Sequence, residues 1–262
     1  MSNIKMIAVD MDGTFLSPQM TYDRDHFQRL YAKMKAEKIL FVVASGNQYY
    51  QLKGFFEPFA DELTFVTENG AFIKDKTELQ VTCFPEGCRP LILDYLKSNP
   101  QLQAVVCTPH MAYILKGDPF AQMISNYYFR MKEVNDFNEV TEPLIKVNIN
   151  FPREQTDHQV LTLNTLMPKE LVAVSSGHGS LDLIQKGYNK AYGLKVLMDK
   201  YNIQPDELLA FGDGGNDIEM LRLAKYSYAM ENATENVKAV AHYRAPSNQD
   251  NGVLRVIETY LL

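Results

Sequence analysis

Apolar residues occur along the first part of the chain in two kinds of block. Residues 4–9, 39–44 and 63–66 are largely apolar runs, the pattern of strands buried on both faces of a parallel sheet. Between them, apolar residues recur at every third or fourth position, as on one face of a helix. These positions are Phe27, Leu30, Tyr31 and Met34, followed by Tyr49, Leu52 and Phe56. The resulting β-α-β-α-β order predicts a Rossmann-like α/β fold with a doubly wound parallel sheet.

The middle of the chain combines short pairs of strands with helices. Residues 104–107 and 111–115 are largely apolar and flank a turn, which predicts a hairpin, and residues 171–174 and 180–184 predict a second one. Further helical patterns and one further strand are expected between these hairpins. They lie near residues 89–96, 120–131 and 154–166 for the helices and 145–151 for the strand. This mixture predicts an α+β cap domain, roughly residues 84–185, inserted into the core.

The α/β pattern of the first segment returns after the insertion. Helix faces and an apolar strand follow one another again. They are Ala191, Leu194, Leu197 and Tyr201, then residues 208–211, then Ile218, Leu221 and Ala224. We therefore expect one core domain built from residues 1–83 and 186–262.

Composition and charge argue against several classes of protein. Apolar residues make up 46% of the 262 positions, enough for a packed core and too many for a disordered chain. The formal net charge of −6 argues against a non-specific nucleic-acid binder. No apolar run has the length of a membrane span, no secretion signal precedes the first strand, and the three cysteines have no metal-like spacing. We expect a cytoplasmic protein without nucleic-acid or membrane partners; the sequence indicates no oligomeric state.

Two carboxylates directly follow the first predicted strand. Asp10 and Asp12 are two residues apart, and Gly13 after them lets the chain turn sharply. In an open α/β sheet, ligands bind at the carboxyl ends of the strands. An ordinary strand-to-loop turn also uses Asp and Gly, so this motif needs support from elsewhere in the chain.

A second acidic cluster follows the predicted strand at residues 208–211. It extends from Gly212 to Asp217 and includes Asp213 and Asn216. Carboxylates at the ends of two parallel strands repel one another unless a cation lies between them. Oxygen ligands favour Mg²⁺. Although Asp217 alone fits an ordinary helix cap, the two clusters together predict a magnesium site.

Two further polar elements fit the binding of a phosphate group. Ser45, Gly46 and Asn47 follow the second predicted strand, where a small hydroxyl and free backbone N–H groups at a helix start suit a phosphate. Lys190 lies at the start of the helix after the insertion, where a cation is slightly unfavourable. Helix caps and solvated lysines are the commoner roles of such residues, but a lysine near two acidic loops suggests a place in the site.

These elements occur in the order of the four motifs of the haloacid dehalogenase superfamily. Residues 10–14 resemble the first motif, Ser45 the second, Lys190 the third and residues 212–217 the fourth. The resemblance covers nearly the whole chain. It is to the Cof-type phosphatases, in which a large α+β cap is inserted between the second and third motifs.

The resemblance implies a Mg²⁺-dependent phosphatase with a covalent intermediate. Asp10 would attack phosphorus and form an aspartyl-phosphate. Asp12 would protonate the leaving alcohol and then deprotonate the hydrolytic water. The other roles are those of metal ligand, phosphate ligand and supporting residue. The metal ligands would be Asp10, the Asp12 backbone carbonyl and Asp213; the phosphate ligands Ser45, Gly46, Lys190 and Asn216; and the supporting residues Asp217 and Asn47.

The expected substrate is a small phosphorylated metabolite. Residues 44–48 resemble the sugar-phosphatase branch, although Asn47 replaces an arginine that many relatives carry. A large cap that roofs the site favours a compact sugar or polyol phosphate. The polar residues of its predicted loops are Thr108, His110, Ser175, Ser176 and His178. Two alternatives remain open: a phosphomutase, which would use the same intermediate, and a phospho-accepting signalling module.

Overall fold

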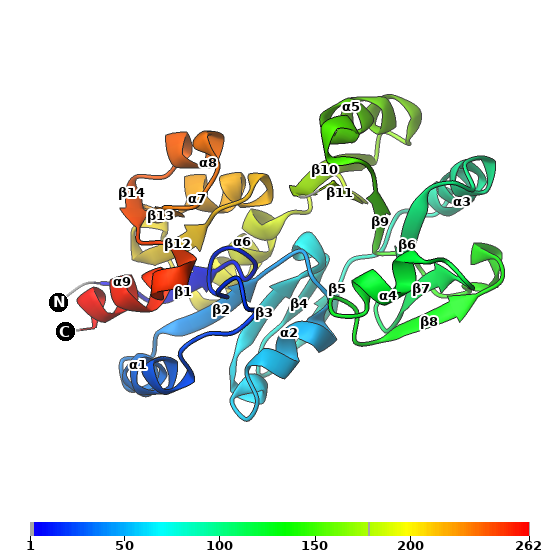
Figure 1. Ribbon diagram of the computed structural model, residues 1–262. Coiled ribbons are helices and arrows are strands. Elements are labelled where there is room, and N and C mark those ends of the chain that lie inside the picture. The colour runs from blue at the N-terminus through cyan, green and yellow to red at the C-terminus, as the bar shows by residue number, and fades with distance from the viewer. Residues whose placement is uncertain (1–2, 178, 262) are drawn as a thin grey trace.

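The computed structural model describes residues 3–177 and 179–261, and their strands form two separate β-sheets (Figure 1). The larger sheet has the order β14-β13-β12-β1-β2-β3-β4-β5. Its strands are β1 (Met6–Val9), β2 (Leu40–Ala44), β3 (Thr64–Thr67), β4 (Phe72–Lys74), β5 (Leu79–Val81), β12 (Leu208–Gly212), β13 (Tyr226–Met230) and β14 (Tyr243–Ala245). All neighbours are parallel except at β4 and β5, which are antiparallel. The expected α/β fold with a parallel sheet is confirmed.

Helices cover both faces of this sheet, as in a doubly wound fold (Figure 1). One face carries α1 (Arg24–Ala36), α2 (Tyr49–Phe55) and α9 (Gly252–Tyr260), and the other carries α6 (Lys190–Tyr201), α7 (Ile218–Leu223) and α8 (Glu235–Val240). The apolar stripe predicted for α1 is buried in the sheet core. Asp23 begins this helix because its side chain accepts the backbone N–H of His26.

The second sheet lies within the predicted cap and has the order β10-β11-β9-β6-β7-β8. Its strands are β6 (Gln103–Cys107), β7 (Ala112–Leu115), β8 (Met131–Val134), β9 (Lys146–Asn150), β10 (Leu171–Gly177) and β11 (Ser180–Gln185). The helices that accompany it are α3 (Cys88–Ser98), α4 (Phe120–Ile124) and α5 (Thr156–Leu166). Both predicted hairpins, β6–β7 and β10–β11, are antiparallel pairs. The extent of the cap, residues 84–185, stays a prediction.

The two faces of the cap sheet differ in chemistry, because side chains alternate along each strand. Val147, Ile149, Leu181 and Leu183 belong to a hydrophobic cluster with α3 and α5. The opposite face of β9 and β11 carries three polar residues that are buried nonetheless. They are Lys146, Asn148 and Asp182. This polar face meets the core domain next to the candidate site.

The helix predicted over residues 120–131 is wrong in its second half. The structure has a helix only at α4, and Met131 already begins β8. The side chain of Gln48 in the core bonds both peptide groups of Arg130, at 2.9 Å to its carbonyl oxygen and 2.8 Å from its N–H. Because this contact fixes Arg130 directly before β8, tertiary contacts override the helical pattern here.

Four short strands of the larger sheet, β4, β5, β13 and β14, are absent from the sequence-based prediction. β4 and β5 have three residues each, too few for a recognisable alternation.

Among the described helices, none combines the length and apolar character needed to cross a membrane.

Candidate active site

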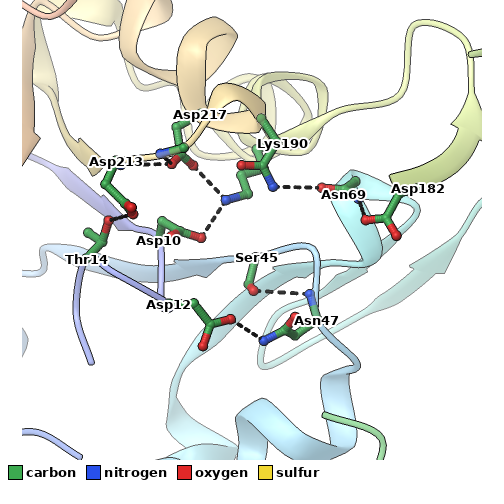
Figure 2. Close-up of polar contacts among 12 residues, drawn as sticks. Asp10, Asp12, Thr14, Ser45, Asn47, Asn69, Asp182, Lys190, Asp213 and Asp217 are labelled. Carbon is green, nitrogen blue, oxygen red and sulfur yellow. Dashed lines mark hydrogen bonds and ion pairs between the residues drawn. The ribbon is translucent and has the colours of Figure 1, made fainter. Parts of the chain in front are cut away.

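Asp10 and Asp213 meet because the strands that precede them are parallel neighbours. Asp10 follows β1 and Asp213 follows β12, and these strands pair from Met6 with Leu208 to Val9 with Phe211. Their carboxyl ends therefore lie at the same edge of the sheet. Figure 2 shows both side chains converging there with those of Lys190 and Asp217.

Lys190 lies between two carboxylates in the interior of the site. It is the first residue of α6 and only 1% exposed, with Nζ at 2.5 Å from Asp10 Oδ1 and 2.6 Å from Asp217 Oδ1. Burial alone would lower the pKa of Lys190, but the two carboxylates outweigh it and raise the pKa above its usual value. The lysine is therefore a fixed cation beside Asp10.

The carboxylates of the site outnumber this cation. Oxygen atoms of Asp10, Asp213 and Asp217 lie within 4.8 Å of one another. Burial raises the pKa of Asp10 well above its ordinary value, Asp217 and Asp213 raise it further, and Lys190 opposes them. Burial and then Asp217 raise the pKa of Asp213 to about 6. One lysine does not balance three carboxylates, and this excess of negative charge fits a hard divalent cation such as Mg²⁺.

Two details of the backbone shape this acidic cluster. Gly13 has φ +75°, and a Cβ there would lie 2.4 Å from Asp213 Oδ2, so only glycine leaves room for that carboxylate. Asp217 Oδ2 accepts the backbone N–H groups of Asp213 and Gly214, each at 3.0 Å. Since the other oxygen of Asp217 contacts Lys190, both of its oxygens already have protein donors. These contacts suit the predicted supporting role of Asp217 better than that of a metal ligand.

We expect Asp213→Asn to stabilise the metal-free protein increasingly as pH rises. The folded protein keeps a proton on Asp213 up to about pH 6, whereas the unfolded chain loses it near 3.8. Stability from this group is therefore present at low pH and is lost between pH 4 and 6. Asparagine has no charge to bury. The free energy of unfolding of the Asp213→Asn variant, relative to that of the wild type, should therefore rise across this window by up to about 3 kcal/mol, at about 1.4 kcal/mol per pKa unit.

Thermal unfolding in chelator from pH 4 to 7.5 measures this difference. Asp75→Asn is a control of opposite sign. Burial would raise the pKa of Asp75, but hydrogen bonds from Lys200, Tyr201 and Thr77 hold it below its ordinary value. Removing that charge should therefore destabilise the protein near neutrality. A stability difference for Asp213→Asn that does not change with pH would contradict the prediction.

The loop after β2 brings three predicted residues together on the other side of Asp10. The Asn47 backbone N–H donates to Ser45 Oγ at 3.1 Å, and its side-chain Nδ2 donates to Asp12 Oδ2 at 2.5 Å (Figure 2). Asn47 thus contacts the predicted acid/base residue directly. Asn216, the remaining predicted phosphate ligand, lies in the 3₁₀ turn Gly215–Asp217.

A buried layer beneath this loop received no role from the sequence, although the resemblance extends to Glu68 and Asn69. Lys146 of the cap lies 2.6 Å from Glu68 Oε2 and donates to the Gly46 carbonyl oxygen at 2.7 Å. Asn69 lies next to Glu68 and contacts both Asn216 and the cap residue Asp182. One signal was available. Glu68 and Asn69 follow β3 at the same edge of the sheet, where parallel topology gathers functional side chains.

The polar cap residues proposed from sequence do not all lie where a ligand can reach them. Thr108 is 3% exposed, and its hydroxyl bonds the backbone of Met111 within its own turn. His110 is exposed and Ser175 is partly exposed. The side chain of Ser176 and the whole of His178 lie outside the described residues.

Comparison with known proteins identifies the family. The chain matches the family described as haloacid dehalogenase-like hydrolase over residues 7–257. It therefore belongs to the haloacid dehalogenase-like hydrolases, the superfamily that its four motifs resemble.

Relatives and solved structures agree with this membership. The 5-amino-6-(5-phospho-D-ribitylamino)uracil phosphatase YbjI of Escherichia coli (strain K12) is 43% identical, over 99% of this chain and 97% of its own. The phosphatase YitU of Bacillus subtilis (strain 168), named for the same substrate, is 24% identical over 97% of both chains. The structure of SMU.1108c from Streptococcus mutans UA159 has a TM-score of 0.94 and 39% identity, covering 98% of this chain and 99% of that one. The enzyme class expected from the motifs, a phosphatase, is confirmed.

Proposed function

We propose that this chain is a Mg²⁺-dependent phosphomonoester hydrolase that acts through an aspartyl-phosphate on Asp10. One observation carries the proposal: Asp10 is buried between the Lys190 cation at 2.5 Å and the carboxylates of Asp213 and Asp217. A phosphate that reaches Asp10 needs positive charge on both sides of the nucleophile. Lys190 supplies the positive charge on one side. Mg²⁺ held by Asp10, Asp213 and the Asp12 backbone would supply the other by neutralising charge between nucleophile and phosphate.

In the first step, a carboxylate oxygen of Asp10 attacks phosphorus and the ester P–O bond breaks. Asp12 gives its proton to the departing oxygen, which leaves as an alcohol. In the second step, Asp12 takes a proton from water, whose oxygen attacks phosphorus. The bond between phosphorus and Asp10 then breaks and releases inorganic phosphate. The amide of Asn47, bonded to Asp12 at 2.5 Å, holds the acid/base group in place through both steps.

The phosphoryl oxygens would be held by side chains around Asp10. Lys190 contributes its charge, and the Asn47 N–H, which already donates to Ser45 Oγ, leaves the Ser45 hydroxyl hydrogen for a phosphoryl oxygen. The Gly46 N–H and the Asn216 amide complete the cradle. These donors stabilise the charge that develops on the phosphoryl group during transfer.

We further propose a small sugar or polyol phosphate as the substrate. Two relatives are phosphatases of a phosphoribityl compound, whose phosphate is carried on a polyol chain. The polar face of the cap sheet lies toward the core and suits a hydroxyl-rich leaving group better than an apolar one. A cap that covers the site would also exclude bulk water during the reaction.

A phosphate-release screen with purified protein tests the proposal. The panel contains sugar and polyol phosphates, 5-amino-6-(5-phospho-D-ribitylamino)uracil, nucleotides, phosphoamino acids and pyridoxal phosphate, each with Mg²⁺ and with chelator. We expect free phosphate only with Mg²⁺, and the highest kcat/KM on a polyol or sugar phosphate. Full turnover in chelator would contradict the metal assignment. A kcat/KM that is much higher on a nucleotide or on pyridoxal phosphate than on any sugar or polyol phosphate would contradict the substrate class.

The same experiment separates the alternatives. Transfer of the phosphate to a second hydroxyl of the substrate, in place of its release, would identify a mutase. A long-lived phosphorylated Asp10 without turnover would favour a signalling module.

A further inference from the structure

A chain of three polar side chains connects the cap to the candidate phosphate site. Asn216 Nδ2 donates to Asn69 Oδ1 at 3.3 Å. Asn69 Nδ2 donates to Asp182 Oδ2 at 2.7 Å (Figure 2). Asn69 is 2% exposed and Asp182, on cap strand β11, is 3% exposed. No residue of this chain of contacts except Asn216 has a role in the mechanism above.

The order of donors and acceptors along these three side chains follows from the carboxylate at the end of the row. An ionised carboxylate only accepts hydrogen bonds, whereas an amide has one accepting and one donating end. Asp182 therefore forces Asn69 to turn its NH₂ group toward the cap and its oxygen toward Asn216. Asn216 must then donate a hydrogen bond from its own NH₂ group to the Asn69 oxygen. The second hydrogen of that NH₂ group remains for another acceptor.

The members of this chain of contacts have little freedom to move. The other oxygen of Asp182 accepts from Asn148 Nδ2 at 2.8 Å, and the same amide donates to Ser180 Oγ at 2.7 Å. The Asn69 backbone N–H donates to the Ser45 carbonyl at 3.2 Å. Its side chain packs so closely on Gly46 that a Cβ there would lie 3.0 Å from Asn69 Oδ1. The amide is therefore held against both phosphate-binding loops.

We propose that Asp182 is a positioning residue for phosphate binding: through Asn69, it orients the Asn216 amide so that an N–H faces the phosphoryl group. This inference rests on the proposed function, because it assigns the phosphate as the acceptor of that N–H. It makes the phosphate cradle depend on a residue of the cap. The cap thus helps to assemble the site that binds the phosphoryl group, in addition to reading the leaving group.

The first test is Asp182→Asn, which reverses the order of donors. The amide introduced at position 182 would keep its oxygen for Asn148 and present its NH₂ group to Asn69, which must flip. Asn216 would then turn its oxygen toward Asn69 or lose that bond. We expect the affinity for inorganic phosphate, measured by calorimetry with Mg²⁺, to fall roughly 10- to 100-fold, the scale of one hydrogen bond to a charged group. kcat/KM should fall equally for aryl and alkyl phosphates, because the phosphoryl group is common to both.

The second test restores the order with both residues exchanged. In N69D/D182N, the carboxylate at position 69 accepts from the amide at position 182 and from Asn216, so Asn216 regains its orientation. Aspartate is tolerated at the left-handed backbone of Asn69, φ 54°. We expect phosphate affinity within about threefold of the wild type, a coupling typical of residues in direct contact. N69D alone places two carboxylates next to each other, so its phosphate affinity should stay below that of the double variant.

A third measurement separates positioning from a general loss of structure. In the Asn216→Ala background, Asp182→Asn should cause no further loss of phosphate affinity, since the group that it orients is gone. A merely structural role would add its full effect in this background as well. Unfolding curves of every variant accompany the comparison.

Four results would overturn the inference. They are an unchanged phosphate affinity in folded Asp182→Asn, an exchanged double variant as defective as that single one, the full effect of Asp182→Asn in the Asn216→Ala background, and unequal losses on aryl and alkyl phosphates. Should Asp182→Asn not fold, the exchanged double variant decides alone by its phosphate affinity. A wild-type protein that releases phosphate from no substrate with Mg²⁺ refutes the proposed function instead, which keeps the two failures distinct.

Discussion

Replacing Asp10 with asparagine is expected to lower kcat by roughly 10⁴- to 10⁶-fold, the range for loss of a nucleophile that acts as a unit with its partners. Asparagine has nearly the same shape but no charge with which to attack phosphorus. Lys190 keeps its contact with Asp217 at 2.6 Å, so the surrounding site should survive. Phosphate release on the best substrate of the screen measures the loss.

A second readout shows that the Asp10→Asn protein is folded. The pKa of Asp10 is well above its ordinary value, first because of burial. The ionised side chain therefore costs folding free energy near pH 7, and its loss should leave the metal-free protein at least as stable. Asp94→Asn, at an exposed position of α3, is the matched control and should change neither quantity. Near-normal turnover in a folded Asp10→Asn protein would refute the covalent mechanism.

Replacing Lys146 with methionine is expected to destabilise the protein by about 3–5 kcal/mol, the cost of removing one partner of a buried ion pair. Lys146 and Glu68 are 2% and 4% exposed at the side chain and 2.6 Å apart. Burial already raises the pKa of Glu68, and Lys146 is the first group to oppose it. Without the lysine, a buried carboxylate and the Gly46 carbonyl oxygen lose their charged donor.

Urea denaturation of Lys146→Met measures this effect against two references. Lys53→Met removes an ion pair of similar length, 2.8 Å to Asp61, at the protein surface, where such pairs contribute less than about 1 kcal/mol. The double variant E68Q/K146M removes both charges and should recover part of the loss. Equal destabilisation by Lys146→Met and Lys53→Met would show that losing one partner of the buried pair costs no more stability than losing one partner of the surface pair.

The sequence by itself determined the α/β fold and predicted which motif residues gather at one edge of the sheet. Strand and helix periods are local properties of the chain, so they were readable without coordinates. Parallel topology then places the end of each strand at one edge of the sheet. Asp10, Ser45 and Asp213 each follow such a strand, and for this reason their meeting was predictable. The sequence suggested a place for Lys190 in the site, because a cation is slightly unfavourable at a helix N-terminus and this one lies near two acidic loops.

Only the tertiary structure decided how the cap meets the core. Asn69 and Asp182 are 113 positions apart, and Lys146 reaches Gly46 across 100 positions. The cap segment after α4 also depends on the core, because the side chain of Gln48 bonds both peptide groups of Arg130 directly before β8. No local period encodes which residues of two domains come into contact. Those contacts arise from the docking of one folded surface on another, where buried polar groups must find partners that neither domain supplies alone.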